Sequence, residues 1–265
     1  MLNQNSPIGV LDTGVGGLTV VKEIQRLMPN EDIIYIGDSI NCPYGNKSIA
    51  EIKQLTAKML DFLAENHVKA AAVACNTISS ALELYDFKYD FEIKGIVYPA
   101  VQYIKSTDIK NVGVFATSFT IGTGCYKELL SKVSDEIKVF SKSSPSLAAI
   151  IESGKFDSPE AEKEIVDKIS DILSECEDVH DVILACTHYP IIMDVFKKSF
   201  PNIDFINPAF EQAMFLKKYL MQNNALKDSG KSVAKIYTTG NTDIVNKVCK
   251  KIGISSDAQI MKTML

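Results

Sequence analysis

The chain has 265 residues, 46% of them hydrophobic and 23% charged, with a net charge of −5 at pH 7. These proportions are typical of a folded globular protein and exclude a disordered, collagen-like or low-complexity chain. Because the Lys and Arg residues are scattered and the balance is acidic, the composition also argues against a nucleic-acid-binding protein.

In the first part of the chain, short apolar segments alternate with segments of helical periodicity. We predict strands at residues 8–11, 32–36, 70–74 and 92–97, and helices at 18–27, 49–63 and 79–84. Ser48 and Glu51 have the spacing of a capping box, in which each side chain accepts a hydrogen bond from the other residue's backbone N–H. Strand, polar turn and helix in this order form the repeating unit of an α/β fold.

The same plan starts again at about residue 98. We predict strands at residues 112–116, 137–140, 181–185, 203–206 and 234–238, and helices at 124–133, 159–175, 191–200, 210–222 and 243–252. This alternation predicts the α/β class, with parallel sheets and helices on both faces. The repeat alone places one domain boundary near residue 98. A second boundary, where the chain returns to the first domain, is expected near residue 207.

Polar motifs follow several of these strands at the point where each strand ends. They are Asp12-Thr13, Asp38, Cys75-Asn76-Thr77, Thr117 and Cys186-Thr187-His188. In open parallel sheets, ligands bind beyond the carboxyl ends of the strands. If the two halves meet with these edges together, we expect one cleft between them.

The six cysteines are too few for a disulfide scaffold and form no Cys-x-x-Cys pair, and no run of about 18 apolar residues occurs. We therefore expect a cytoplasmic protein without membrane contact. A free cysteine is often only a small buried hydrophobe, and we interpret four of the six as packing or surface residues: Cys42, Cys125, Cys176 and Cys249. Cys75 and Cys186 differ because each lies where an apolar strand meets a polar loop. Two thiols on opposite sides of a stereogenic carbon can invert it, one as base and one as acid.

Three other titratable residues are candidates beside the thiols. Asp12 precedes a small-residue turn, where it can either serve an anion site or cap the next helix. His188 is close enough in sequence to Cys186 to relay its proton. Glu152 ends an apolar stretch, and the sequence alone slightly favours an ordinary acid at a helix end.

At these residues the chain resembles the cofactor-independent aspartate/glutamate racemases. The matching segments are residues 8–18, Gly37-Asp38 with Pro43-Tyr44-Gly45, residues 74–77, Thr117 with Thr120, and residues 186–190. They span nearly the whole chain in the order expected for the family. His188 is typical of the glutamate branch, because the aspartate branch usually has glutamate at that position.

The resemblance implies two pseudo-symmetric flavodoxin-like domains, residues 1–97 plus 208–265 and residues 98–207, with the active site between them. It implies that Cys75 exchanges the α-proton of D-glutamate and Cys186 that of L-glutamate. Asp12, His188 and Glu152 would assist. Substrate contacts would come from Thr13, Pro43, Tyr44, Gly45, Asn76, Thr77, Thr117, Thr120 and Thr187. The resemblance further implies no pyridoxal phosphate and no metal, a homodimer, and a role in supplying D-glutamate for peptidoglycan.

Some positions depart from the family pattern. Residues 39–42 are Ser-Ile-Asn-Cys, where a threonine, a small residue, a basic or polar residue and valine are usual, and Thr13 replaces the usual serine. These departures leave open a racemase that acts on aspartate or on both acids. A lyase or isomerase of the same superfamily and a non-catalytic protein that binds acidic amino acids are further alternatives.

Overall fold

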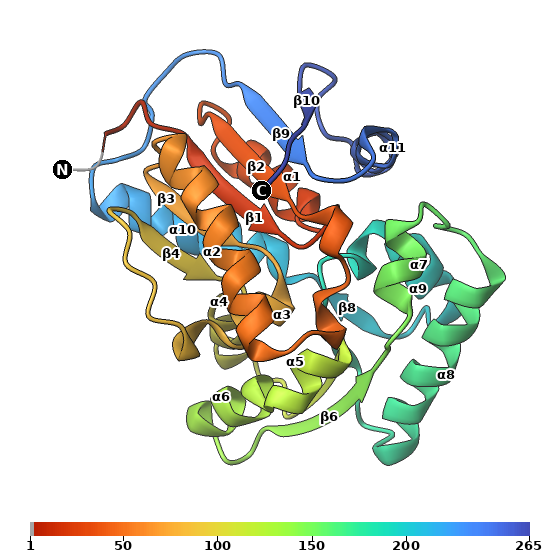
Figure 1. Cartoon of the computed structure of the whole chain (residues 1–265). Helices are drawn as coiled ribbons and strands as arrows, with labels where there is room; N and C mark the ends of the chain where they lie inside the picture. Colours follow the sequence, from red (N-terminus) through yellow and green to blue (C-terminus); the bar gives the residue numbers. More distant parts are fainter. Residues whose placement is uncertain (1–2) are drawn as a thin grey trace.

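The computed structural model describes residues 3–265, which form two parallel β-sheets with helices on both faces (Figure 1). The first sheet has the strand order β10-β9-β2-β1-β3-β4, and the second has the order β6-β5-β7-β8. The first contains β1 (Ile8–Asp12), β2 (Ile33–Gly37), β3 (Ala70–Val73), β4 (Glu92–Gly95), β9 (Ala234–Thr238) and β10 (Gln259–Lys262). The second contains β5 (Asn111–Ala116), β6 (Lys138–Ser143), β7 (Asp181–Ala185) and β8 (Asp204–Ile206). The predicted α/β class is confirmed; residues 1 and 2 of the predicted first domain lie outside the described residues.

The first sheet is covered on both faces because its inner strands β1, β2 and β3 are buried along their whole length. Along β1, Val10 faces one hydrophobic cluster and Leu11 the opposite one. The Leu11 side is covered by α2 (Ile49–Glu65), which Figure 1 shows in front of the sheet. The Val10 side is covered by α1 (Leu18–Leu27), α10 (Pro208–Gln222) and α11 (Thr242–Ile252).

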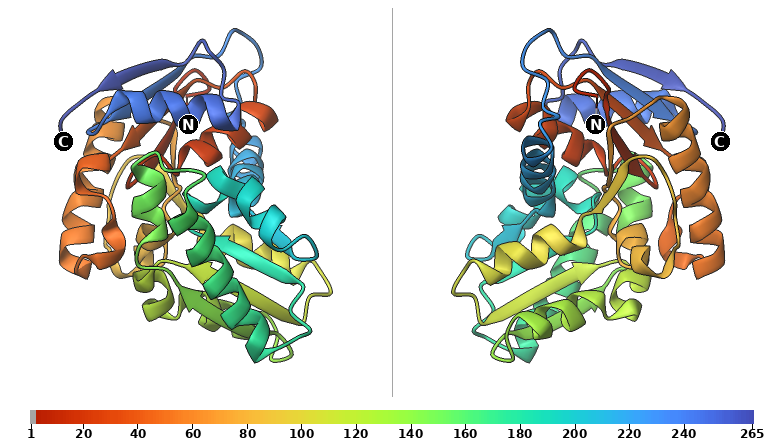
Figure 2. Two further views of the ribbon diagram at one scale, coloured as in Figure 1. Left: turned by 90° about the vertical axis from the view of Figure 1, so that its right-hand side faces the viewer. Right: turned by 90° about the vertical axis from the view of Figure 1, so that its left-hand side faces the viewer.

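The second sheet is built in the same way. Val112, Val114 and Ala116 of β5 point to the face that α4 (Val97–Lys105) and α6 (Cys125–Val133) cover. Phe115 points to the other face, which α8 (Pro159–Glu175) and α9 (Met193–Ser199) cover. The two side views in Figure 2 show this smaller sheet below the first one.

The C-terminal segment returns to the first sheet. β9 pairs in parallel with β2, in register from Ile33 with Ala234 to Gly37 with Thr238, and β10 adds the edge strand. The strands before residue 96 and after residue 233 thus share one sheet, and those between 111 and 206 share the other. The predicted domain limits at residues 97 and 208 stay a prediction.

Two local predictions were wrong or incomplete. Instead of a helix at 79–84, the chain forms a single turn, α3 (Asn76–Ser79), and a 3₁₀ helix, η3 (Leu82–Leu84), because Cys75 already caps α3 with extended backbone. The strand predicted to reach residue 97 ends at Gly95, and α4 begins at Val97. Pro99 lies in the first turn of α4, where it is tolerated because the first-turn N–H groups of a helix lack intrahelical partners.

The capping box of α2 is confirmed. The Ser48 hydroxyl accepts from the Glu51 N–H, and the Glu51 carboxylate accepts from the Ser48 N–H at 2.9 Å. Across residues 3–265, none of the helices has the length and apolar character that crossing a membrane would require.

Candidate active site

A pocket lies where the carboxyl ends of the two sheets face each other. It is lined by Thr13, Cys42, Pro43, Tyr44, Gly45, Cys75, Asn76, Thr77, Thr117, Ala148, Cys186, Thr187 and His188. Both predicted cysteines are therefore in one pocket, one after β3 of the first sheet and one after β7 of the second. Of the predicted site residues, Asp12, Glu152 and Thr120 do not line it but lie directly behind residues that do.

On the first-sheet side, Cys75 is nearly buried, and its only side-chain partner among the described residues is a hydroxyl. Its Sγ lies 3.7 Å from Thr13 Oγ1. Burial, and secondly the negative charge of Asp12, raises the pKa of the Cys75 thiol well above its ordinary value. At neutral pH this group is a thiol, ready to donate a proton.

On the second-sheet side, Cys186 has an imidazole beside it. Its Sγ lies 3.8 Å from His188 Nδ1, and His188 Nε2 lies 2.6 Å from Glu152 Oε2. Burial alone would lower the pKa of His188, but its hydrogen bonds and the charge of Glu152 raise it well above the ordinary value. Burial alone would raise the pKa of Glu152, but the bond from His188 lowers it below the ordinary value. The pair is thus an imidazolium and a carboxylate.

Glu152 ends α7 (Leu147–Glu152) and is held by the loop after β1. Its Oε2 accepts a hydrogen bond from the Val15 N–H at 2.9 Å. A Cβ at Gly14 would come within 2.7 Å of Glu152 Cδ, and one at Gly16 within 2.8 Å of the His188 backbone nitrogen. Glycines allow this close approach. The loop after β1 of the first sheet therefore holds His188 and Glu152 in place on the second-sheet side.

Asp12 is fully buried and accepts hydrogen bonds from the start of α1 and from Thr187. The bond to the start of α1 agrees with the predicted helix cap, and the predicted anion site stays a prediction. Its Oδ2 accepts from the N–H of Gly17, the residue that caps α1, at 2.8 Å. Its Oδ1 also accepts a longer bond from Thr187 Oγ1, at 3.3 Å. Burial raises the pKa of the Asp12 carboxyl, against the lowering effect of His188.

Hydrogen-bonding side chains from both sheets meet on the Cys75 side of the pocket. Thr77 Oγ1 lies 2.9 Å from Thr117 Oγ1, which lies 3.0 Å from Thr120 Oγ1. The Tyr126 hydroxyl donates to Asn76 Oδ1 at 2.7 Å. Within residues 3–265, the buried Asn76 Nδ2 has no hydrogen-bond partner, which leaves a donor for a small polar ligand.

The loop that carries Pro43, Tyr44 and Gly45 is anchored by a buried carboxylate. Asp38 accepts hydrogen bonds from Tyr44 Oη at 2.6 Å and from Thr239 Oγ1 at 3.0 Å, and also from Asn41 Nδ2. The sequence placed Asp38 at a strand end but did not assign it to the site. Its position at the end of β2 was the signal that could have found it.

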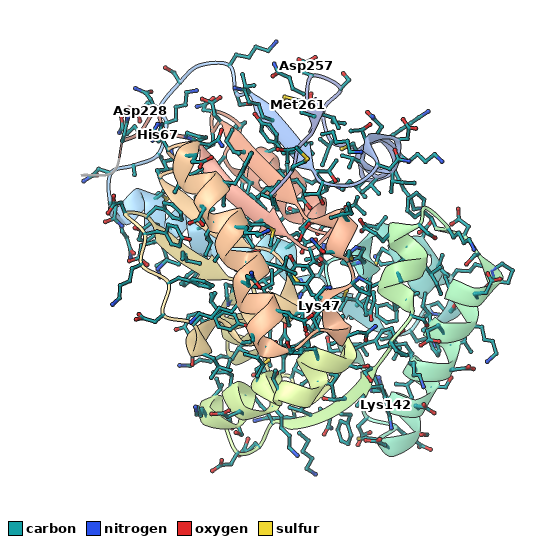
Figure 3. The ribbon with its side chains drawn as sticks, viewed as in Figure 1. Lys47, His67, Lys142, Asp228, Asp257 and Met261 are labelled. Carbon is teal, nitrogen blue, oxygen red and sulfur yellow. The ribbon has the colours of Figure 1, made fainter. Side chains whose placement is uncertain are left out.

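The interpretation of Cys42 was wrong. It was interpreted as a packing or surface residue, but it lines the pocket beside His188. The signal was its position directly before Pro43. Tyr126 and Ala148 had no recognisable signal, because each lies in the first turn of a helix and belongs to no polar motif. The other histidines, His67 and His180, are exposed; His67 is labelled in Figure 3 at the end of the first sheet far from the second.

The chain is similar to known proteins along most of its length. Residues 8–213 match the Asp/Glu/hydantoin racemase family model. The chain is 35% identical over 259 residues to a glutamate racemase of Oceanobacillus iheyensis, covering 96% of this chain and 94% of that protein. It is 32% identical over 249 residues to glutamate racemase 1 of Caldanaerobacter subterraneus subsp. tengcongensis, covering 93% and 92%.

Solved structures show the same similarity. The crystal structure of glutamate racemase isoform RacE1 from Bacillus anthracis matches with a TM-score of 0.90 at 32% identity, over 99% of each chain. That of glutamate racemase from Francisella tularensis in complex with D-glutamate matches with a TM-score of 0.86 at 29% identity, over 98% of each chain.

Proposed function

Since the chain belongs to the Asp/Glu/hydantoin racemase family and is an amino-acid racemase, we propose that it interconverts L-glutamate and D-glutamate by proton transfer at two thiols. The observation that carries the proposal is that Cys75 and Cys186 line one pocket from the strand ends of two different sheets. An acid and a base on opposite faces of the α-carbon are what inversion requires. Glutamate is the substrate in the names of the similar proteins.

For L-glutamate, the Cys186 thiolate takes the α-proton, so that the C–H bond breaks and its electron pair stays on the α-carbon and carboxylate. The Cys75 thiol then delivers its proton to the opposite face, forming the new C–H bond of D-glutamate. The enzyme is left with the proton on Cys186, and D-glutamate reacts by the reverse sequence. The raised pKa of the buried Cys75 agrees with this starting state, in which Cys75 is protonated.

The α-proton of an amino acid is only weakly acidic, so the site must stabilise negative charge that develops on the substrate. We assign the binding of the substrate carboxylates to Asn76 Nδ2, which has no partner among the described residues, and to the hydroxyls of Thr77 and Thr187, which line the pocket. The His188 imidazolium adds a positive charge beside Cys186. Enclosure of the pocket strengthens each of these interactions by excluding water.

The proposal is tested by α-proton exchange in deuterated buffer without added cofactor. Wild-type protein should introduce deuterium into L-glutamate and D-glutamate and invert both, and L-aspartate should react much more slowly. Cys75→Ala and Cys186→Ala should each abolish inversion. Cys75→Ala should still exchange the proton of L-glutamate without inverting it, and Cys186→Ala that of D-glutamate.

Inversion retained by either alanine variant would refute the two-thiol mechanism. Faster exchange with aspartate would instead assign the enzyme to aspartate. Stabilisation by glutamate without any exchange in the wild type would indicate a binding protein. We further propose the D-glutamate product as a peptidoglycan precursor, a homodimeric assembly, and domains at residues 1–97 plus 208–265 and 98–207. These rest on the family resemblance.

A further inference from the structure

A third thiol lies at the edge of the active site, outside the proton-transfer mechanism. Cys42 lines the pocket directly after the 3₁₀ helix η1 (Ser39–Asn41). One ligand atom from each of Cys42, Glu152 and His188 lies within 4.8 Å of the other two. Thiolate sulfur, imidazole nitrogen and carboxylate oxygen are the three ligand types that zinc takes in proteins.

We propose that Cys42, Glu152 and His188 form a binding site for a thiophilic divalent cation of the Zn²⁺ type, and that a cation bound there inhibits the enzyme. The mixed sulfur, nitrogen and oxygen set selects against Mg²⁺ and Ca²⁺, which prefer oxygen ligands. Around a tetrahedral zinc ion such ligand atoms lie about 3.5 Å apart, so side-chain shifts of about 1 Å close the site.

The three ligands come from separate elements, and each is held in place by the surrounding structure. Cys42 lies on the loop that Asp38 anchors through Tyr44. Glu152 is held by the Val15 N–H, and His188 lies three residues after the end of β7. Ligands that are already fixed lose little conformational freedom when a metal binds, which favours affinity.

Burial and charge also suit a divalent cation. The side chains of His188 and Glu152 are 3% and 14% exposed. Zn²⁺ binding displaces the thiol proton of Cys42 and any proton on the coordinating imidazole nitrogen. The two positive charges of the ion are then balanced by the Cys42 thiolate and the Glu152 carboxylate, so the partly buried site holds no net charge. The fourth position stays open to water.

Inhibition follows from the position of His188. Its Nδ1 lies 3.8 Å from Cys186 Sγ and its Nε2 2.6 Å from Glu152 Oε2. A metal that coordinates the imidazole and the carboxylate breaks the contact between them and replaces the proton on the coordinating nitrogen, so His188 no longer serves as an imidazolium beside Cys186. Occupation of the site should therefore stop proton transfer at Cys186 while leaving the fold intact.

The test uses Co²⁺ as a probe for the Zn²⁺ site, because a thiolate ligand gives Co²⁺ a charge-transfer absorption. Wild-type protein should show this absorption at one equivalent of Co²⁺, and added Zn²⁺ should remove it. Cys42→Val should lose it. Cys176→Ser, a change of a thiol outside the pocket, should keep it, and so should Cys75→Ala. Since the readout is spectroscopic, it is independent of whether glutamate is the substrate.

The second readout is racemisation by each variant relative to its own metal-free rate. Zn²⁺ should inhibit the wild type reversibly, with recovery on chelation, and Cys42→Val should need at least tenfold more Zn²⁺. If Cys42→Val fails to fold, Cys42→Ser keeps the size of the side chain and should show the same loss of metal binding. A charge-transfer band that survives both Cys42 changes, or that vanishes in Cys75→Ala, would place the metal on the catalytic thiols and overturn the proposal.

Discussion

The surroundings of Cys75 and Cys186 differ although the two thiols occupy equivalent places in the fold. Each follows an inner strand of its sheet, β3 or β7, and each is 5% exposed. Cys75 has the Thr13 hydroxyl at 3.7 Å, whereas Cys186 has the His188 imidazole at 3.8 Å with Glu152 behind it. The repeated strand-and-loop plan sets the positions, and the loops set the proton chemistry of each position.

The difference matters because the reaction itself is symmetric. L-glutamate and D-glutamate have equal free energies, so kcat/KM must be the same in both directions for any variant. An asymmetric site can therefore not favour one direction at low substrate concentration. It can only change which of the two proton transfers is slow, and isotope effects report that.

Apart from removal of the thiols themselves, the largest expected effect comes from removing the imidazole. His188→Asn should lower kcat/KM about 100- to 10,000-fold in both directions, the range for loss of an acid–base group. The slowed step should be the transfer at Cys186. With α-deuterated substrates, the isotope effect should therefore rise for L-glutamate and stay small for D-glutamate.

His180→Asn, a change of an exposed histidine, is the matched control and should behave as wild type. An isotope effect that rises equally for both enantiomers would show that His188 acts on the whole pocket. It would then not belong specifically to Cys186, and the contrast between the two thiols would be lost.

The next prediction tests how the loop after β1 of the first sheet positions His188 and Glu152 on the second-sheet side of the pocket. Gly16→Ala would put a methyl group within 2.8 Å of the His188 backbone nitrogen, which cannot move without shifting the β7 loop. A displacement of this kind should cost about 100-fold in kcat. Gly122→Ala, where a Cβ meets nothing within 4 Å, should leave the rate unchanged. Equal rates for the two variants would contradict a tight contact between the loop and His188.

Much of this arrangement could be predicted from the sequence, and the remainder has a physical reason. Strand ends with polar motifs identified Cys75, Cys186 and Asp12, because the carboxyl edge of a parallel sheet collects such residues. Glu152 was undecided because its role depends on the Val15 N–H, 137 positions earlier in the chain. A contact of that kind leaves no local pattern.

Other errors came from local signals that the tertiary structure overrode. The strand predicted at residues 92–97 ends at Gly95, because the chain enters α4 at Val97. Cys42 looked like an isolated small hydrophobe because nothing in its neighbourhood indicates that His188 lies opposite. The edge strand β10 has no pronounced alternation and is defined by its pairing with β9.

A smaller effect on the kinetics is expected from removing the hydrogen bond by which α6, on the second sheet, supports Asn76 on the Cys75 side of the pocket. Tyr126→Phe removes the hydrogen bond to Asn76 Oδ1 and leaves that buried acceptor unpaired, at a cost of about 1 to 2 kcal/mol. Because Asn76 is proposed to bind substrate, KM should rise about tenfold with kcat little changed. Tyr98→Phe, at an exposed tyrosine, should change neither constant. A fall in kcat alone would show that Asn76 acts on the proton transfer instead.

The smallest effect concerns Asp12, the buried acid shared by the two sides. Burial raises its pKa above the ordinary value of 3.8, so the folded protein binds the proton more tightly than the unfolded chain does. The stability that this gives is present below pH 3.8 and is lost as the pH rises through the folded pKa. At neutral pH the buried carboxylate therefore disfavours the folded state.

Asp12→Asn removes that charge and keeps an oxygen that can accept from the Gly17 N–H. The variant should be more stable than the wild type by about 1 kcal/mol at neutral pH, and the difference should shrink towards about pH 4, as urea unfolding at several pH values would measure. Its racemisation should nevertheless be slower, so stability and activity move in opposite directions. Asp108→Asn, at an exposed aspartate, should show no such pH-dependent gain. A destabilised Asp12→Asn protein at neutral pH would mean that the carboxylate is held by its hydrogen bonds more strongly than burial opposes it, and Asp12 would then be a structural anchor for both thiols.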